Sequence, residues 1–201
     1  MTPRLYGDPL SGNCYKVMLA LHRLGRAYEF VSVDLLAGQT RTPEFLALNP
    51  AGQVPLLQLS PERCLPESNA ILLYLAEGTP LLPADPWQRA QVHRWLFWEQ
   101  YQHEPNVGVA RFIVRYLDNP PAQAARLALC QQRGAAALAL MDRELGRRPF
   151  IAGAEFSVAD IAVFAYTHVA PEGGIALEPH RALRAWIERV RSQPGFVAMA
   201  G

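Results

Sequence analysis

The sequence lacks the patterns that would tie the protein to a metal, a membrane or nucleic acid. Its three cysteines form no Cys-x-x-Cys pair and its five histidines are scattered, so we expect no metal site. No apolar run approaches the roughly 20 residues that span a bilayer. Lysine and arginine together number 19 against 18 acidic residues, with a net charge of +1 and no dense basic run, which disfavours a nucleic-acid partner.

The few cysteines also bear on the compartment. An odd, sparse set, Cys14, Cys64 and Cys130, is typical of a reducing environment rather than of a disulfide framework. The first residues read directly as a strand, without the pattern of a signal peptide. We therefore expect a cytoplasmic protein with no membrane anchor.

The first part of the chain alternates strand and helix patterns. Short strands are predicted at 4–6, 28–34, 56–59 and 63–65. Helices are predicted from Ser11 to Leu24, from Pro43 to Leu48 and from about residue 68 to Glu77. This order is typical of a thioredoxin-like domain.

The rest of the chain reads as helical after a proline-rich connector. Helices are predicted at 87–102, with a break or a kink at Pro105, and at 110–116, 122–145, from Ser157, and 180–190. We therefore divide the chain into a thioredoxin-like domain (1–78), a linker (79–86) and an all-helical domain (87–201), an α/β fold followed by a helical bundle.

The stretch from Asn49 to Leu75 carries the pattern with the most chemistry. A cis Val54-Pro55 bond at the start of a strand would present the Val54 backbone to an extended peptide. Ser68 is predicted to cap the next helix, where its hydroxyl and the N–H groups of the first turn can hold an anion. Glu67 beside it suits an ammonium group. Together these groups fit a small zwitterionic peptide.

These motifs carry a family resemblance. The run NPxGxVPxL, followed by a strand and ESxAIxxYL, resembles the glutathione-binding half of the cytosolic glutathione S-transferase superfamily. The run SVADIAVF, a capping box of Ser157 and Asp160, looks like the folding signature of that family's helical domain. The resemblance covers the whole chain and implies glutathione as co-substrate, a small electrophile as second substrate, and a homodimer.

The resemblance offers several candidates for activating the glutathione thiol. Ser11 and Asn13 stand where many bacterial members use a serine or threonine and a supporting asparagine, and we favour this pair. Tyr6 ends the first strand, where other branches place a tyrosine. Cys14 is the third candidate, because a thiol near a helix N-terminus can be acidified for disulfide chemistry. For each hydroxyl a purely structural role competes, namely helix capping for Ser11 and strand packing for Tyr6.

The remaining contacts follow from the same resemblance. Val54, with Pro55, is predicted to pair with the cysteinyl unit, Glu67 and Ser68 to hold the γ-glutamyl end, and Gln53 to meet the glycyl carboxylate. Four residues that flank Pro105 are predicted to wall an apolar pocket for the electrophile: Tyr101, His103, Asn106 and Phe112.

Three functions remain open at this point. The first is a glutathione transferase that acts on small hydrophobic electrophiles. The second is a glutathione-dependent disulfide or peroxide reductase that uses the same site. The third is a non-catalytic ligand-binding protein that has kept the transferase fold.

Overall fold

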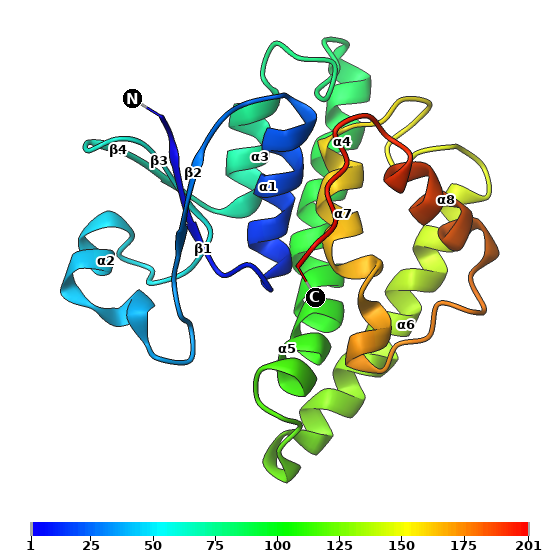
Figure 1. The fold of residues 1–201 in the computed structure, drawn as a ribbon. Coiled ribbons are helices and arrows are strands. Elements are labelled where there is room, and N and C mark those ends of the chain that lie inside the picture. The colour runs from blue at the N-terminus through cyan, green and yellow to red at the C-terminus, as the bar shows by residue number, and fades with distance from the viewer. Residues whose placement is uncertain (1, 201) are drawn as a thin grey trace. The chain divides into compact units, whose positions relative to one another are not determined.

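A computed structural model describes residues 2–200 and separates into two compact units (Figure 1). The first comprises the chain up to Glu77 together with the segment from Pro194 on, and the second is Gly78–Gln193. The last residues, which the sequence analysis assigned to the helical domain, therefore belong to the first unit. There the Tyr15 hydroxyl donates to the Val197 carbonyl at 2.6 Å.

The expected linker is not a separate element. Leu81 and Leu82 are buried, and the Leu81 carbonyl accepts a hydrogen bond from the Val158 amide at 3.0 Å. Two apolar side chains and a backbone hydrogen bond thus fix this segment within the second unit.

The first unit is a four-stranded mixed sheet with helices on both faces. The sheet order is β2-β1-β3-β4; β1 and β2 are parallel, and the other neighbours are antiparallel. Its elements are β1 (Arg4–Gly7), α1 (Gly12–Arg23), β2 (Glu29–Ser32), η1 (Gln39–Arg41), α2 (Pro43–Leu48), β3 (Leu56–Ser60), β4 (Arg63–Pro66) and α3 (Ser68–Ala76). Helices α1 and α3 lie side by side on one face and α2 lies on the other (Figure 1). The predicted thioredoxin-like fold is confirmed.

Alternation along β1 explains how the sheet is covered. Leu5 is fully buried, whereas the next side chain, Tyr6, points to the opposite face and meets the Phe45 ring of α2 edge-on at 6.4 Å between centroids. Leu56 and Leu57 of β3 are both fully buried because both faces of the sheet are covered.

The second unit is entirely helical, as predicted. Its elements are α4 (Pro86–Trp98), η2 (Glu99–Gly108), α5 (Val109–Arg115), η3 (Pro121–Gln123), α6 (Ala124–Leu145), α7 (Val158–Thr167), η4 (Ala170–Gly173) and α8 (Arg181–Arg191). All ten residues of α7 are buried, so this helix forms the centre of the unit. Among the described residues, no helix is both long and apolar enough to cross a bilayer.

The sequence predicts a break or a kink at Pro105, and the helix does not break there. The chain passes from α4 through η2, a π-helix of ten residues, directly into α5. A proline lacks the N–H that the regular α-helical ladder requires, and a π-helical stretch is a local departure from that ladder. The helix therefore continues past Pro105 with altered register instead of ending.

The capping box at the start of α7 is confirmed, and its Asp160 accepts further hydrogen bonds that the sequence pattern does not predict. Asp160 accepts hydrogen bonds from the amides of Ser157 and Ile151 and from the indole N–H of Trp186, at 2.8 to 3.0 Å. Burial raises the pKa of Asp160 to about 6, and these hydrogen bonds oppose that rise. One carboxylate thus joins α7 to the preceding turn and to α8.

Candidate active site

The first candidate, Ser11, lies at the N-cap of α1. Its backbone is extended, and its Oγ accepts a hydrogen bond from the Cys14 amide at 3.4 Å. A hydroxyl has one proton and two lone pairs, so accepting the cap bond leaves the proton for another partner. The predicted capping role is therefore present, and it is compatible with donation to a thiolate.

Asn13 lies in the first turn of α1 and is joined to the start of α3. The Ser68 hydroxyl donates to Asn13 Oδ1 at 3.4 Å, and the same Ser68 oxygen accepts from Lys16 Nζ at 3.3 Å. These contacts connect one candidate for thiol activation, Asn13, with one candidate for the γ-glutamyl end, Ser68. Lys16 was missed in the sequence because a lone lysine in an amphipathic helix reads as a solvated charge.

The prediction that Ser68 caps α3 needs correction. The N-cap is Glu67, and Ser68 is the first helical residue, buried with its hydroxyl turned toward Lys16 and Asn13. Glu67 is exposed and has φ of 72°, a left-handed conformation that is uncommon for a residue with a side chain. Strained backbone of this kind often marks functional positions, and here it precedes the first N–H groups of α3.

The loop before β3 carries Val54, the residue predicted to pair with the cysteinyl unit. The Val54-Pro55 bond is cis, and Val54 precedes the first ladder residue, Leu56, so its N–H and C=O lie outside the sheet. The buried side chain of Asn49 fixes the loop, donating to the Gln53 carbonyl at 2.8 Å and accepting from the Ala51 amide at 3.1 Å.

Gln53 has an exposed side chain, so it lies at the surface of this loop. Arg41, in the preceding η1, donates to the Ala51 carbonyl at 3.3 Å. The side chain of Gln39 accepts from the Asp34 amide at 2.8 Å. Both side chains therefore stabilise the loops that carry them.

Tyr6 is engaged elsewhere. Its hydroxyl donates to Gln58 Oε1 at 3.0 Å, on the sheet face that α2 covers. Helix α1 and its N-terminal Ser11 lie against the opposite face (Figure 1). The geometry therefore favours the packed-strand role for Tyr6 over thiol activation.

Cys14 is unsuited to act as a nucleophile. Its side chain is fully buried, and burial raises its pKa to about 12, although the Ser11 hydroxyl acts in the opposite direction. Its Sγ lies so close to Gly7 that a Cβ there would stand 2.7 Å from the sulfur. A protonated, enclosed thiol is neither ionised nor accessible to a disulfide.

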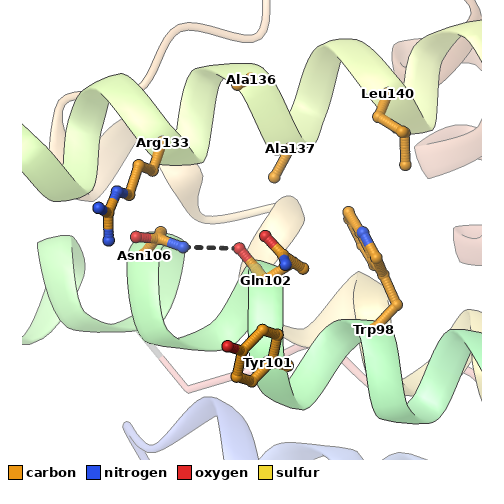
Figure 2. A pocket seen from close by; sticks show the side chains of 8 residues that line it. All are labelled: Trp98, Tyr101, Gln102, Asn106, Arg133, Ala136, Ala137 and Leu140. Carbon is orange, nitrogen blue, oxygen red and sulfur yellow. Dashed lines mark hydrogen bonds between the residues drawn. The ribbon is translucent and has the colours of Figure 1, made fainter.

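The four predicted walls of the electrophile pocket do not form one group. Tyr101 and Asn106 line a cavity of about 580 Å³ between η2 and α6 (Figure 2), together with Trp98, Gln102, Arg133, Ala136, Ala137 and Leu140. Phe112 is exposed on α5 and stacks on Tyr116. The prediction that His103 is a wall of this pocket needs correction. Its ring is fully buried and hydrogen-bonded to Thr167 at 2.9 Å, so it belongs to the helical core.

The chain is similar to known proteins over most of its length. The chain matches the family model for the glutathione S-transferase N-terminal domain over residues 1–77 and that for the C-terminal domain over residues 122–189. Glutathione S-transferase 3 of Zea mays is 37% identical over 205 residues, covering 96% of this chain and 90% of the relative. A crystal structure of a glutathione S-transferase from Pseudomonas fluorescens Pf-5 is 47% identical, with a TM-score of 0.97 and 100% of both chains covered.

A relative with a different named activity has similar coverage. The disulfide-bond oxidoreductase YfcG of Escherichia coli is 31% identical over 205 residues, covering 94% of this chain and 90% of the relative. The matching family models, the identities and the coverage together lead to one conclusion: the chain belongs to the glutathione S-transferase superfamily.

Proposed function

We propose that this protein is a glutathione S-transferase that binds glutathione on its thioredoxin-like unit and adds the glutathione thiolate to small hydrophobic electrophiles. The observation that carries the proposal is the hydrogen bond between Ser68 and Asn13. It brings a candidate anion site at the start of α3 next to the first turn of α1, where Ser11 caps the helix. Detoxification of reactive compounds is the role that suits this chemistry.

The ends of glutathione would be held by different groups. The γ-glutamyl carboxylate meets Ser68 and the first N–H groups of α3, and the exposed Glu67 pairs with the γ-glutamyl ammonium. Val54 pairs with the backbone of the cysteinyl unit ahead of the cis Pro55. Gln53 meets the glycyl carboxylate at the loop surface.

Ser11 would activate the thiol, with Asn13 in support. The thiolate is the nucleophile, and an ordinary thiol with a pKa of about 8.5 is mostly protonated at neutral pH. Lowering that pKa by about two units requires about 2.7 kcal/mol of preferential stabilisation of the anion. A hydroxyl donor next to a helix N-terminus supplies an effect of this order.

The chemical step itself needs little more from the protein. The thiol proton passes to solvent, the sulfur forms a bond to the electrophilic carbon, and the leaving group departs with the electron pair of the bond that breaks. Tyr101, Asn106 and Phe112 remain the proposed contacts of the electrophile, with the cavity along η2 as the recess that two of them line.

A reductase activity is the second candidate, favoured by the similarity to a named disulfide-bond oxidoreductase. Because Cys14 is buried with a raised pKa, such a reaction would use the thiols of glutathione rather than this cysteine. Two molecules of glutathione would then be oxidised to the disulfide while the substrate disulfide is reduced to two thiols, which take up the two protons that the glutathione thiols release.

We further propose a cytoplasmic homodimer. Three large aromatic side chains on α4 and η2 are strongly exposed: Trp87 at 72%, Phe97 at 74% and Tyr101 at 80%. Aromatic side chains are enriched at protein interfaces. All three cysteines are free thiols, as expected in a reducing compartment.

Steady-state kinetics with glutathione and an aryl halide, compared with kinetics on a small disulfide and on a hydroperoxide, test the proposed function. We expect saturable turnover of the aryl halide that falls by about 25-fold at pH 7 in Ser11→Ala, because the thiolate fraction drops from about three quarters to about 3% when the thiol pKa rises from about 6.5 to about 8.5. Binding of glutathione without turnover of any of these substrates would instead favour a ligand-binding role.

A further inference from the structure

Lys16 is an unusual residue for the interior of a small domain. It lies on α1, and its side chain is fully buried. Lysine is almost never fully buried without a partner, because removing an ammonium group from water is costly. The buried position of Lys16 therefore indicates that its positive charge has a role within the first unit.

The hydrogen bonds around Ser68 have a fixed direction. An ammonium group only donates, so the Ser68 oxygen accepts from Lys16 Nζ at 3.3 Å. The single Ser68 proton then points to Asn13 Oδ1, at 3.4 Å. This gives a directed chain from Lys16 through Ser68 to Asn13, between the N-terminal half of α1 and the start of α3.

A carboxylate at the start of α3 would enter this chain at Ser68. The serine can rotate its proton from Asn13 to the incoming oxygen while its own oxygen still accepts from Lys16. The anion would then lie one hydroxyl away from a buried positive charge. A charge in a poorly solvated interior acts more strongly across such a distance than a charge at the surface.

We propose that Lys16 is a positioning residue for the γ-glutamyl carboxylate of glutathione. It acts through Ser68, fixing the orientation of the hydroxyl and placing a positive charge behind it. This inference rests on the proposed function, because it takes glutathione as the ligand of this site.

The test compares two peptides on three variants. The peptides are glutathione and its analogue that lacks the γ-glutamyl α-carboxylate, in which 4-aminobutyrate replaces the γ-glutamyl unit. The variants Lys16→Met and Lys16→Gln remove the charge, and Lys16→Arg keeps it. Dissociation constants are measured by calorimetry, and thermal unfolding shows that each variant is folded.

We expect the neutral variants to bind glutathione about 10- to 100-fold more weakly, as the loss of one nearby charge implies. Their affinity for the decarboxylated analogue should stay within about twofold of wild type, since the analogue lacks the group that Lys16 serves. Lys16→Arg should keep most of the preference for glutathione. In a Ser68→Ala background, the Lys16→Met loss should shrink, because the two residues act in one chain.

Each contrary result has a distinct meaning. An equal loss of both peptides in folded Lys16→Met and Lys16→Gln would overturn the inference, because it would indicate a structural role for Lys16. Unchanged glutathione affinity in either folded neutral variant would overturn it as well. If wild type binds neither peptide, the proposed function fails, and with it the ligand on which the inference depends.

Discussion

Substitution of His168 should reveal a hidden pH dependence of the stability. His168 follows α7, donates through Nδ1 to the Phe164 carbonyl at 2.8 Å and stacks on the Phe164 ring at 4.4 Å. Burial lowers its pKa from 6.5 to about 4. The neutral ring is therefore favoured in the folded state, and this contribution to stability is present above pH 6.5 and lost as the pH falls toward 4.

Asp160 acts in the opposite sense. Burial raises its pKa from 3.8 to about 6, so the folded state gains stability from this group as the pH falls through 6 toward 3.8. Integrated between about pH 6.5 and 4.5, each group changes the free energy of unfolding by about 2 kcal/mol, with opposite signs. The two contributions nearly cancel in the wild type.

The substitution His168→Gln removes the pH-dependent contribution of His168 and leaves that of Asp160. The variant should be less stable than wild type near neutral pH, because it loses the stacking on Phe164. The difference in the free energy of unfolding between wild type and variant should narrow by about 2 kcal/mol when the pH falls from about 6.5 to 4.5, since only the wild type then loses the His168 contribution.

Urea unfolding followed by circular dichroism at three pH values measures the gap. The variant His22→Gln, which changes an exposed histidine of the first unit, controls for the general effect of losing a histidine. A gap between wild type and His168→Gln that stays constant or widens on acidification would refute the reasoning.

Other predictions concern the glutathione site. Cys14→Ala should retain transferase and disulfide-reductase activity, because the buried, protonated Cys14 is not a nucleophile. In the wild type, Cys14 should resist alkylation at neutral pH while the partly exposed Cys64 reacts. Loss of activity in Cys14→Ala would contradict this description of Cys14. Gly52→Ala should raise the KM for glutathione and cost about 1–3 kcal/mol of stability, because φ is +61° and the new Cβ would stand 2.9 Å from the Thr40 carbonyl. Gly38→Ala is the matched control for stability, because Gly38 also has a positive φ but has open space around the Cβ position. If urea unfolding shows that the two variants lose equal stability, the contact with the Thr40 carbonyl has no role.

Much of the fold could be predicted because its determinants are local. The strand at 56–59 and the capping box at Ser157 depend on residues close together in the sequence, and both predictions were confirmed. The continuous helix at Pro105 could not be predicted, because a proline normally interrupts the α-helical hydrogen bonds and sequence spacing does not reveal a switch to π-helical register.

The site was harder to predict because its contacts are long-range. Ser68 was expected to cap its own helix, yet its hydroxyl bonds to residues more than fifty positions away. Lys16 looked like a surface charge and His103 like a wall of the electrophile pocket, and only packing between distant elements buries them. Ser11 was predictable as an N-cap, since capping is a local property.

The central claim is that Ser11 ionises the thiol of bound glutathione. Its direct test is a pH titration of that thiol by ultraviolet thiolate absorbance in wild type, Ser11→Thr, Ser11→Gly and Ser11→Ala. Threonine keeps the hydroxyl, and glycine keeps most of the capping but lacks the hydroxyl, which separates the two roles of Ser11. We predict ionisation about two pH units below the ordinary thiol pKa in wild type and Ser11→Thr, and a return toward about 8.5 in the other two. A thiol that ionises at the same low pH in Ser11→Gly and Ser11→Ala as in wild type would contradict the account.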